Sequence, residues 1–512
     1  MALHDRFSPF FNGEEQLEMN TVTCVVAGTC ALATILLLRY FIQDPLRQVP
    51  GPRIARWTSL WIQMLDLAGY RSLVIHDLHA KFGPVVRIGP NELSFSGRQA
   101  FREIYSANSD FIKAPRYGAF GRKSMFTMRN KQEHRFRAKR IAPVFSPATL
   151  GEVEVPVSRL IEKFVHALER RVDRPLDVLL WFRILTMDTF GEMFLGTNFG
   201  GLDNEKPPEV LEELDNVFPT YYLEWQFPWL FRLLCLVPHK SLHQYITTGH
   251  RFYKNGGRAF HDYVSRYGRD SQRRDIIQRM IAASTEKKTE APLTDDEIIV
   301  ELTNLIFAGT DTTSNTFSYM FWELAKNPEW QKRLRDEFST VVWGDEVVPR
   351  YKAVSHLPVL DAVVQETLRL WPASPASLPR IAPANGGIVD GTVIPGNTLL
   401  SSQAYTTQRD AQVYPLPNEF HPERWLPEDD VGKGLCTDVE HMRDHILVWG
   451  KGSRTCLGKS IALMELKLGV AAIIKRLSVG LGSETTNEDM EMRDHFVLTA
   501  KGGKCMLKLS RV

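Results

Sequence analysis

The sequence predicts one large, mainly α-helical domain with small β-sheets, preceded by an N-terminal transmembrane helix. Three observations support this prediction: an uncharged apolar run over residues 19–38, helical patterning over most of residues 151–285, and one long helical segment over residues 293–327. The strand-like segments are short, and no repeat, low-complexity stretch or interior linker divides the chain. We therefore expect residues 53–512 to form a single domain.

Composition excludes several classes of protein. The 512 residues include 62 Lys and Arg against 60 Asp and Glu, and so balanced a charge implies no nucleic-acid partner. The hydrophobic fraction of 44% is ordinary for a globular protein with a large core. The six cysteines have no C-x-x-C or other paired spacing, which indicates neither a disulfide framework nor a zinc site. A cysteine with a special role must therefore act alone.

The apolar run near the N-terminus is long enough for a membrane anchor. A helix over residues 19–38 is about 30 Å long, which matches a hydrocarbon core. A cleaved signal peptide is the alternative, but acidic residues rather than a basic leader precede the run. Four arginines follow it, and the positive-inside rule places them in the cytosol. We expect a short lumenal N-terminus (1–18), an anchor (19–41), a proline-rich spacer (42–52) and a cytosolic domain (53–512).

Three helices can be placed from their ends. The longest begins at the capping-box spacing Thr294-x-x-Glu297 and stops before Pro328. Its middle is apolar on nearly every face, so we expect it at the centre of the fold. Two more helices are expected, over residues 357–370 and 459–477.

Three turns predict pairs of strands. Residues 85–95 contain two short strands about a Gly-Pro-Asn turn, and Asp390-Gly391 is typical of a hairpin. A last hairpin is predicted at Gly502-Gly503, between residues 496–498 and 505–509.

A glycine-rich segment, Trp449-Gly-Lys-Gly-Ser-Arg-Thr-Cys-Leu-Gly458, combines features of a reactive cysteine loop. Cys456 precedes a helix, whose free N–H groups and positive dipole end lower the pKa of a thiol. Gly452 and Gly458 permit tight turns and a close approach of the backbone to a flat ligand. Arg454 supplies a cation for an anionic group. A lone cysteine in such a loop is more often structural, but the ten-residue pattern is far more specific.

This loop resembles the haem-binding loop of the cytochrome P-450 family, F-x-x-G-x-R-x-C-x-G, and the resemblance extends from about Val49 to the C-terminus. It implies haem b with Cys456 as the axial thiolate ligand of the iron, and a propionate contact from Arg454. Trp449 stands where the family has Phe. We hypothesise that its indole tunes the iron potential, and an unchanged potential in Trp449→Phe would contradict this.

The long helix carries a polar motif in its apolar middle, Ala308-Gly-Thr-Asp-Thr-Thr313. Threonines there can bond back to preceding carbonyls and bend the helix. The motif also resembles the family's A/G-G-x-D/E-T pattern, which implies that Gly309 makes room for dioxygen and that Thr312 and Asp311 deliver protons. Family members that rearrange peroxides often lack this acid–alcohol pair, so its presence favours monooxygenation.

The resemblance also assigns structural and cofactor contacts. Glu366, Arg369 and Arg424 match the family's E-x-x-R pair and the arginine of P-E-R-F, a buried charge network that holds the cysteine loop. Arg380 matches a propionate-binding position, and residues 376–378 beside it are expected to face substrate. The W-x-x-x-R pattern is imperfect: His134 takes the Trp position and Ala138 the Arg position. Which of Arg135, Arg137 and Lys139 binds the haem therefore stays open.

Two segments suggest partners. Six basic residues lie within residues 129–140: Arg129, Lys131, Arg135, Arg137, Lys139 and Arg140. They are either a solvated helix face or, with Lys451 and Lys459, a docking site for an acidic electron donor, namely an NADPH-dependent reductase with cytochrome b5 as a second candidate. The aromatic-rich residues 218–237 suit either the core or a surface that dips into the lipid bilayer.

The function implied by the resemblance is that of a haem-thiolate monooxygenase, which inserts one atom of O2 into an apolar small organic molecule. The residues around Cys456 look most like membrane-bound members from filamentous fungi, anchored in the endoplasmic reticulum by one helix. Many of these act on terpenoids, polyketides or alkaloids in secondary metabolism. Two alternatives remain: an isomerase or dehydratase of the same fold without a reductase, and a non-catalytic haem sensor or carrier.

Overall fold

The structure is a computed structural model that describes residues 23–35, 38, 43–285, 292–343, 345–426, 435 and 438–512. It divides into two units, Met1–Pro50 and Gly51–Val512, each described here by itself.

In the first unit, residues 23–35 are helical and exposed, and the Thr29 and Thr34 hydroxyls donate to carbonyls one turn back. A search of the described ranges found no helix that is both long and apolar enough for a membrane span. The predicted lumenal segment, residues 1–18, lies outside the described residues, as do parts of the predicted anchor, residues 19–41.

The second unit is mainly α-helical, as predicted. Its α-helices are α2 (Leu60–Leu67), α3 (Arg71–Phe82), α4 (Arg98–Tyr105), α5 (Lys131–Ile141), α6 (Pro147–Glu169), α7 (Val178–Leu195), α8 (Gly201–Asn204), α9 (Val210–Gln226), α10 (Pro228–Cys235), α11 (Lys240–Ile246), α12 (Thr248–Tyr267), α13 (Ile276–Thr285), α14 (Asp295–Lys326), α15 (Pro328–Ser339), α16 (Tyr351–Val354), α17 (Pro358–Leu370), α18 (Ala404–Thr407), α19 (Val439–Asp444) and α20 (Lys459–Arg476). Short 3-10 helices are η1 (Arg53–Arg56), η2 (Pro115–Ala119), η3 (Ala142–Phe145), η4 (Pro422–Trp425) and η6 (Gly452–Arg454).

The strands form small sheets. One has five strands in the order β1 (Val85–Gly89), β2 (Glu92–Phe95), β8 (Leu399–Ser401), β5 (Arg380–Ile381) and β3 (Ile112–Lys113). A three-stranded sheet has the order β4 (Pro175–Asp177), β12 (Met506–Arg511) and β9 (Leu477–Leu481). Two hairpins complete the set: β6 (Gly387–Val389) with β7 (Thr392–Ile394), and β10 (Met492–His495) with β11 (Val497–Ala500). The predictions for residues 85–95 and for the Asp390-Gly391 turn are confirmed.

The predicted hairpin at Gly502-Gly503 is wrong. β11 pairs with β10 across a turn at Phe496, and β12 pairs with β9 and β4. The Asp177 carboxylate accepts the Cys505 N–H at 2.9 Å, which draws the last strand toward β4. The glycine pair therefore redirects the chain between two sheets, a long-range choice that the local pattern does not contain.

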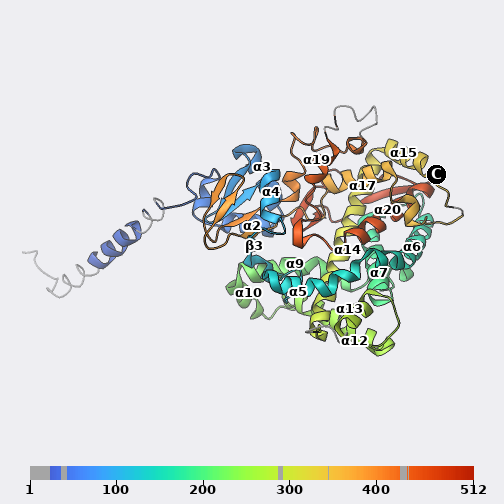
Figure 1. Cartoon of the computed structure of the whole chain (residues 1–512), viewed down its shortest axis with the longest axis horizontal. Coiled ribbons are helices and arrows are strands. Elements are labelled where there is room, and N and C mark those ends of the chain that lie inside the picture. Colours follow the sequence, from blue (N-terminus) through green and yellow to red (C-terminus); the bar gives the residue numbers. More distant parts are fainter. Residues whose placement is uncertain are drawn as a thin grey trace, which may run out of the picture. The chain divides into compact units, whose positions relative to one another are not determined.

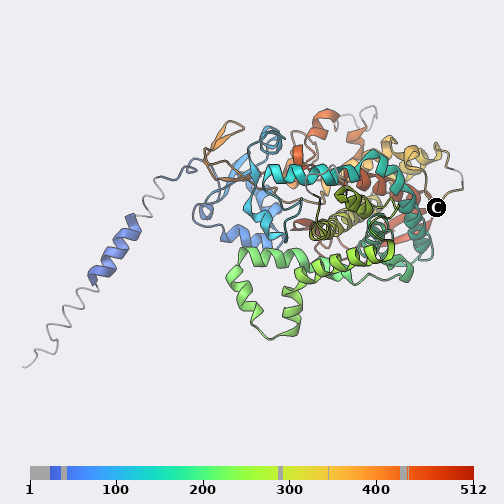
Figure 2. The same cartoon turned by 60° about the horizontal axis from the view of Figure 1, so that its bottom comes forward.

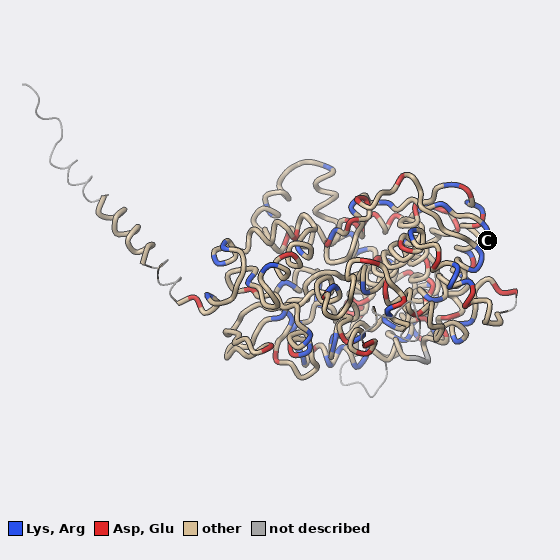
Figure 3. The backbone as a smooth tube through the Cα atoms, turned by 90° about the horizontal axis from the view of Figure 1, so that it is seen from above, with Lys and Arg blue, Asp and Glu red and all other residues tan. Residues whose placement is uncertain are grey.

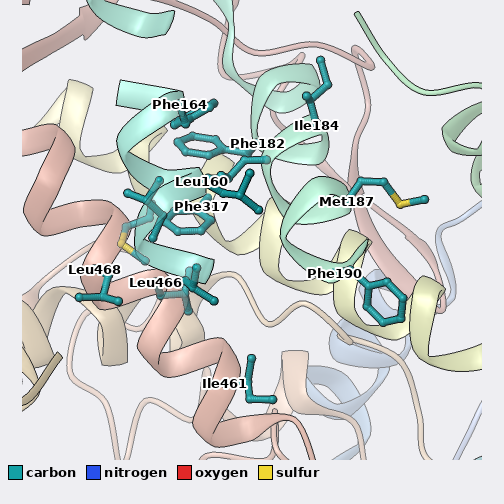
Figure 4. Close-up of a cluster of buried hydrophobic side chains, with 14 of the residues drawn as sticks. Leu160, Phe164, Phe182, Ile184, Met187, Phe190, Phe317, Ile461, Leu466 and Leu468 are labelled. Carbon is teal, nitrogen blue, oxygen red and sulfur yellow. The ribbon is translucent and has the colours of Figure 1, made fainter. Parts of the chain in front are cut away.

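Helix α14 is the centre of the second unit, as predicted (Figure 1). Its capping box is complete: the Thr294 hydroxyl accepts the Glu297 N–H, and the Glu297 carboxylate accepts the Thr294 N–H. Figure 4 shows how α6, α7, α14 and α20 meet there, with Phe182 stacked on Phe317 at a centroid distance of 4.8 Å. Gly469 lets α20 approach, because an added Cβ would lie 2.6 Å from the Phe317 ring.

The aromatic-rich segment, residues 218–237, is buried in one part and exposed in another. Phe218 and Tyr222 of α9 are buried in the core, whereas no residue of α10 is buried. Trp229 is 64% exposed and Leu236 just beyond the helix 79% exposed. Figure 2 shows α10, in light green, on a helical projection from the body of the unit. In Figure 3, basic and acidic residues are mixed over the second unit.

Candidate active site

The Glu366 carboxylate is the centre of a buried charge network. Arg369, one turn along α17, donates from Nε and Nη2 to its two oxygens at 2.8 Å each. Arg424 of η4 donates from Nε at 3.0 Å, and the Trp425 indole N–H adds a bond of 2.9 Å. None of the three charged side chains is exposed to solvent. Burial on its own raises the pKa of Glu366, but Arg369 and Arg424 lower it below its ordinary value. The predicted triad is therefore assembled.

Gln408 joins this network to the cysteine loop. Its Nε2 donates to the Leu368 and Arg369 carbonyls at 2.9 Å, and its Oε1 accepts the N–H groups of Leu447 and Val448. A single buried amide thus ties the end of α17 to the start of the loop. No sequence motif pointed to Gln408, because its role depends only on tertiary contacts.

The cysteine loop is closed by its own backbone. The Cys456 N–H donates to the Trp449 carbonyl at 2.8 Å, which places the indole residue and the thiol on one turn. Gly452 has a φ of 66°, and a Cβ there would lie 2.5 Å from the Tyr105 carbonyl oxygen. A Cβ on Gly458, by contrast, would meet no described atom within 4 Å. Gly452 is thus needed for packing within the protein, while the space beside Gly458 is open.

The Cys456 thiol differs from the prediction in its acidity. Its side chain is exposed, yet the surrounding protein raises its pKa above the ordinary value. The N–H groups of Gly458 and Lys459 do lower the pKa, as expected at the start of α20, but desolvation outweighs them. Without a bound cation, the helix terminus alone does not make this thiol acidic.

One stripe of the buried central helix is accessible. Ala308 is exposed, and Asn304, Leu305, Gly309 and Thr312 are half-buried, while the residues on the other faces of α14 are mostly buried. These positions share one face because they are spaced three to four residues apart. The stripe includes Gly309, which was predicted to make room for dioxygen, and Thr312, which was predicted to deliver protons.

The predicted acid and alcohol have different partners. The Thr312 hydroxyl donates to the Ala308 carbonyl at 2.6 Å, whereas Asp311 points to α7 and forms an ion pair of 3.1 Å with Arg183 Nε. Arg183 also binds Asp215 of α9 at 2.7 Å. Burial raises the pKa of Asp311, although Arg183 opposes the shift, so this carboxyl keeps its proton to a higher pH than an exposed aspartate. Arg183 was not predicted, since it lies 128 residues away.

A cluster of cations lies beside the cysteine loop. We define this cationic cluster as Lys113, Arg380 and Arg454, with His134 beside them. Lys113, Arg380 and Arg454 donate only to carbonyl oxygens, and within the described ranges none of them forms an ion pair with an acidic side chain. Burial and the neighbouring arginines hold the pKa of Lys113 well below its ordinary value, and burial lowers that of Arg454 to about 10. His134, next to Arg454 and Lys113, has a pKa lowered to about 4, first by burial.

These residues fit haem. Buried cations without counter-charges are unfavourable unless an anion joins them, and the two propionates of haem supply such charges. The accessible thiol, the open space at Gly458 and the stripe on α14 are the further features that a flat, thiolate-ligated group needs. Lys113 and His134 were not predicted as cofactor contacts; the one available signal was His134 at the Trp position of the W-x-x-x-R pattern.

The basic residues within residues 129–140 are less exposed than predicted for a solvated helix face or a docking site. Arg137 is buried and bound to Glu297 and Glu301, which removes it as a haem contact, and Arg140 is buried over the Phe136 ring. Arg129 donates to the Lys113 carbonyl. Only Arg135 and Lys139 of the six basic residues are exposed. The difference arises because two of the six basic side chains turn inward: Arg137 reaches Glu297 and Glu301 near the start of α14, and Arg140 is buried.

The buried network can be tested by removing its negative charge. Glu366→Gln leaves Arg369 and Arg424 without a counter-charge, so we expect a loss of about 3–5 kcal/mol in the free energy of unfolding. The urea midpoint followed by circular dichroism measures this. Glu337→Gln is the matched control: that carboxylate accepts only the N–H groups of Val359 and Leu360, so its loss should cost about 1 kcal/mol. Equal losses in the two variants would contradict the central role of Glu366.

Comparison with known proteins shows the family of this chain. The family model described as Cytochrome P450 matches residues 49–507. The cytochrome P450 monooxygenase tazI of Aspergillus terreus is 30% identical over 96% of this chain and 99% of its own length. The monooxygenases orf2 of Aspergillus niger (26% identical, 93% of this chain and 96% of the relative) and BOT1 of Botryotinia fuckeliana (28%, 92% of each) are also similar. The family binds haem through an axial cysteine thiolate, and its members from filamentous fungi include monooxygenases. The chain therefore belongs to the cytochrome P450 family.

Proposed function

We propose that this protein is an NADPH-reductase-dependent haem-thiolate monooxygenase in which Cys456 is the axial ligand of the iron. The observation that carries the proposal is the cationic cluster near the exposed Cys456: Lys113 and Arg380 are buried and Arg454 is half-buried, and none of the three has an acidic partner among the described residues. Lys113, Arg380, Arg454 and His134 would hold the propionates, and Gly458 would leave room for the macrocycle. Trp449 would pack beside the sulfur.

When bound, haem supplies a redox-active iron at which dioxygen is reduced and activated. Cys456 would act as a thiolate, because coordination to a metal deprotonates a thiol whose pKa burial has raised. The thiolate donates electron density that favours O–O cleavage. The Glu366 network and Gln408 would keep the loop, and thus the sulfur, in position.

Proton delivery is the role proposed for Thr312 and Asp311. The Thr312 hydroxyl can accept a proton and pass its own onward once it turns from the Ala308 carbonyl. Burial raises the pKa of Asp311, which makes this carboxyl easier to protonate than an exposed aspartate, and Arg183 positions the carboxylate through the ion pair. An isomerase, a dehydratase or a haem carrier needs no such pair, which favours the monooxygenase over these alternatives.

The electron donor would dock on the exposed half of the basic helix. Arg135 and Lys139 of α5 are exposed, as is Lys459, which follows the cysteine loop at the start of α20. A flavoprotein reductase with an acidic surface, or cytochrome b5 as a second donor, is complementary to this charge.

The membrane is the proposed location. Residues 19–41 would anchor the chain in the endoplasmic reticulum with residues 53–512 in the cytosol, and the exposed tryptophans of α9 and α10 (Trp225 and Trp229) suit the lipid interface. Release of the full chain from membranes by an alkaline carbonate wash would contradict the anchor.

The substrate proposed is an apolar small molecule of fungal secondary metabolism, a terpenoid, polyketide or alkaloid.

The carbon-monoxide difference spectrum of the reduced protein tests the ligand. We expect a strongly red-shifted Soret band that is lost in Cys456→Ser, because the shift requires a thiolate ligand on the haem iron, which Cys456 would supply. Cys505→Ser, a change at a buried cysteine in the last sheet, is the control and should keep the band. A spectrum without the shift in the unaltered protein would overturn the mechanism.

Thr312→Ala tests proton delivery. With a substrate found by screening small apolar molecules for a spin-state shift, we expect hydrogen peroxide to account for most of the NADPH consumed, since the distal proton is no longer supplied. Product formed per NADPH should fall by about 10²-fold. Thr316→Ala is the matched control, because its hydroxyl donates one turn further on to the Thr312 carbonyl at 2.8 Å. Unchanged coupling in Thr312→Ala would remove the role.

Charge reversal tests the docking face. Arg135→Glu with Lys139→Glu should slow association with the reductase by about tenfold at low salt, and the difference should fade at high salt as screening increases. Stopped-flow reduction of the iron measures the rate. Lys254→Glu, an exposed change on α12, should have no effect. An unaltered rate and salt dependence in the α5 variant would place the donor elsewhere.

A further inference from the structure

Glu301 is a buried carboxylate on the central helix that accepts hydrogen bonds from two other parts of the chain. Its Oε1 accepts the Met125 N–H at 2.8 Å and Nη1 of Arg137, on α5, at 3.0 Å. Arg137 also binds Glu297, whose second oxygen belongs to the capping box of α14. A buried carboxylate without donors would be unfavourable, so these two contacts fix the position of the Glu301 side chain.

Met125 belongs to a compact turn, residues 124–128, which we call the carbonyl turn. The N–H groups of Thr127 and Met128 donate to the Ser124 carbonyl at 3.0 and 2.8 Å. The Ser124 N–H donates to the Thr127 hydroxyl at 2.8 Å. The turn is therefore closed by its own hydrogen bonds, while the Met125 N–H connects it to the central helix.

Two carbonyl groups of the carbonyl turn hold members of the cationic cluster. The Met125 carbonyl accepts Nη1 of Arg454 at 3.4 Å, and the Phe126 carbonyl accepts the Lys113 ammonium. This ammonium also lies 4.3 Å from the centre of the Tyr117 ring and 4.7 Å from that of the Phe126 ring. Two consecutive residues thus connect the central helix, through one N–H, to both cations, through their carbonyls.

The two cations need this support because no negative charge of the described residues fixes them. Lys113 of β3 is paired in register with Arg380 of β5, and like charges directly opposite each other repel. Burial, Arg454 and Arg380 hold the pKa of Lys113 well below its ordinary value. Since the ammonium ends a flexible four-carbon chain, its position depends on the carbonyl and the rings around it.

Helix α5 contributes to the cationic cluster only indirectly. Ala138 stands at the arginine position of the W-x-x-x-R pattern, and the neighbouring Arg137 turns to the carboxylates of α14. His134, one turn earlier, adds no charge at neutral pH because its pKa is lowered to about 4, first by burial. The arginine of α5 therefore acts on the site by binding the carboxylate that holds the carbonyl turn.

We propose that Glu301 is a positioning residue of the cofactor site: it holds the carbonyl turn against α14, and this turn fixes Lys113 and Arg454 where they bind the haem propionates. In this role Glu301 contacts neither cofactor nor substrate and acts through the turn. It lies four residues before Leu305 of the accessible stripe, so one helix sets both the stripe and the cations. The inference rests on the proposed haem site.

The positioning role depends on the oxygen that accepts the Met125 N–H more than on the charge of Glu301. Burial raises the pKa of Glu301 to about 7, against the effects of Arg137 and the Met125 N–H, so near neutral pH a large fraction of this carboxyl is neutral. Glu301→Gln keeps an acceptor oxygen, and Arg137 keeps its ion pair with Glu297. Glu301→Ala removes the acceptor, so the two substitutions separate the contact from the charge.

The first experiment measures how fast the full-length ferric protein, in detergent, loses haem to excess apomyoglobin, followed by the absorbance of the myoglobin formed. Glu301→Ala should speed the transfer by roughly fivefold, the value of one hydrogen bond, and Glu301→Gln by less than about twofold. Asp177→Ala is the matched control, because its carboxylate also accepts a backbone N–H from a distant segment, that of Cys505 at 2.9 Å. Its rate should be unchanged. An unchanged rate in Glu301→Ala, or equal rates in the Ala and Gln variants, would overturn the role.

Met125→Pro tests the same contact from the other partner. Proline lacks the N–H and suits the second position of a tight turn, while the carbonyl that binds Arg454 is kept. We expect the same acceleration as in Glu301→Ala, so this variant decides the question if Glu301→Ala does not fold. Met125→Leu keeps the N–H and should transfer haem at the rate of the unaltered protein. Equal rates in Met125→Pro and Met125→Leu would count against the contact.

A double-mutant cycle separates positioning from a general loss of stability. If Glu301 acts through Lys113, the effect of Glu301→Ala on the transfer rate should fall to about twofold in a Lys113→Met background. The full effect in that background would mean that Glu301 supports the fold in general, and the positioning role would be wrong.

Failure of the haem proposal gives a different result. A protein whose reduced carbon-monoxide spectrum lacks the red shift would refute the haem-thiolate function, and the positioning role with it. A red-shifted spectrum with a transfer rate that Glu301→Ala does not change would refute only the positioning role. Glu301→Ala itself should keep the red shift, because Gln408 holds the cysteine loop separately.

Discussion

The architecture around the site depends on one buried carboxylate. Glu366 accepts bonds from Arg369, Arg424 and Trp425, and these three come from a helix and from a 3-10 turn more than fifty residues later. A buried ion network adds little stability compared with an apolar core, but each partner becomes costly without the others. The network therefore holds the segment around η4 against α17. Gln408 links the end of α17 to the start of the cysteine loop through hydrogen bonds to Leu368 and Leu447. A metal ligand on a loop needs this support, since a loop alone does not fix a sulfur.

The Glu366 network and the cationic cluster differ in their balance of charge. In the Glu366 network, the carboxylate is the counter-charge of Arg369 and Arg424. Other N–H groups of these two arginines donate to backbone carbonyl oxygens. In the cationic cluster, Lys113, Arg380 and Arg454 meet without an acidic partner in the described part of the chain. The first group is complete as protein and serves the fold, whereas the second is complete only with an anion. This imbalance, rather than the cysteine, is what makes the site a cofactor site in physical terms.

Local patterns predicted local structure well. The capping box at Thr294, the turn at Asp390 and the spacing of Glu366 and Arg369 all depend on residues within one or two turns, and the structure has them as expected. Long-range choices were not predictable. The last strands pair with partners that the Gly502-Gly503 turn does not reveal, Arg183 meets Asp311 across 128 residues, and Arg137 turns inward because α14 offers Glu297 and Glu301. The acidity of Cys456 was misjudged for a similar reason: desolvation is a property of the whole fold, and it exceeded the effect of the helix terminus.

Helix α10 has a consequence for how this protein can change over time. Since none of its residues is buried, substitutions there remove no core contacts and cost little folding free energy. The opposite holds where Gly469 touches Phe317, since any side chain larger than hydrogen collides with a ring. Sequence drift should therefore be rapid at the projection and slow at the crossing of α14 and α20. A lineage can in this way alter the surface at α10 while the packed centre at α14 and α20 is left intact.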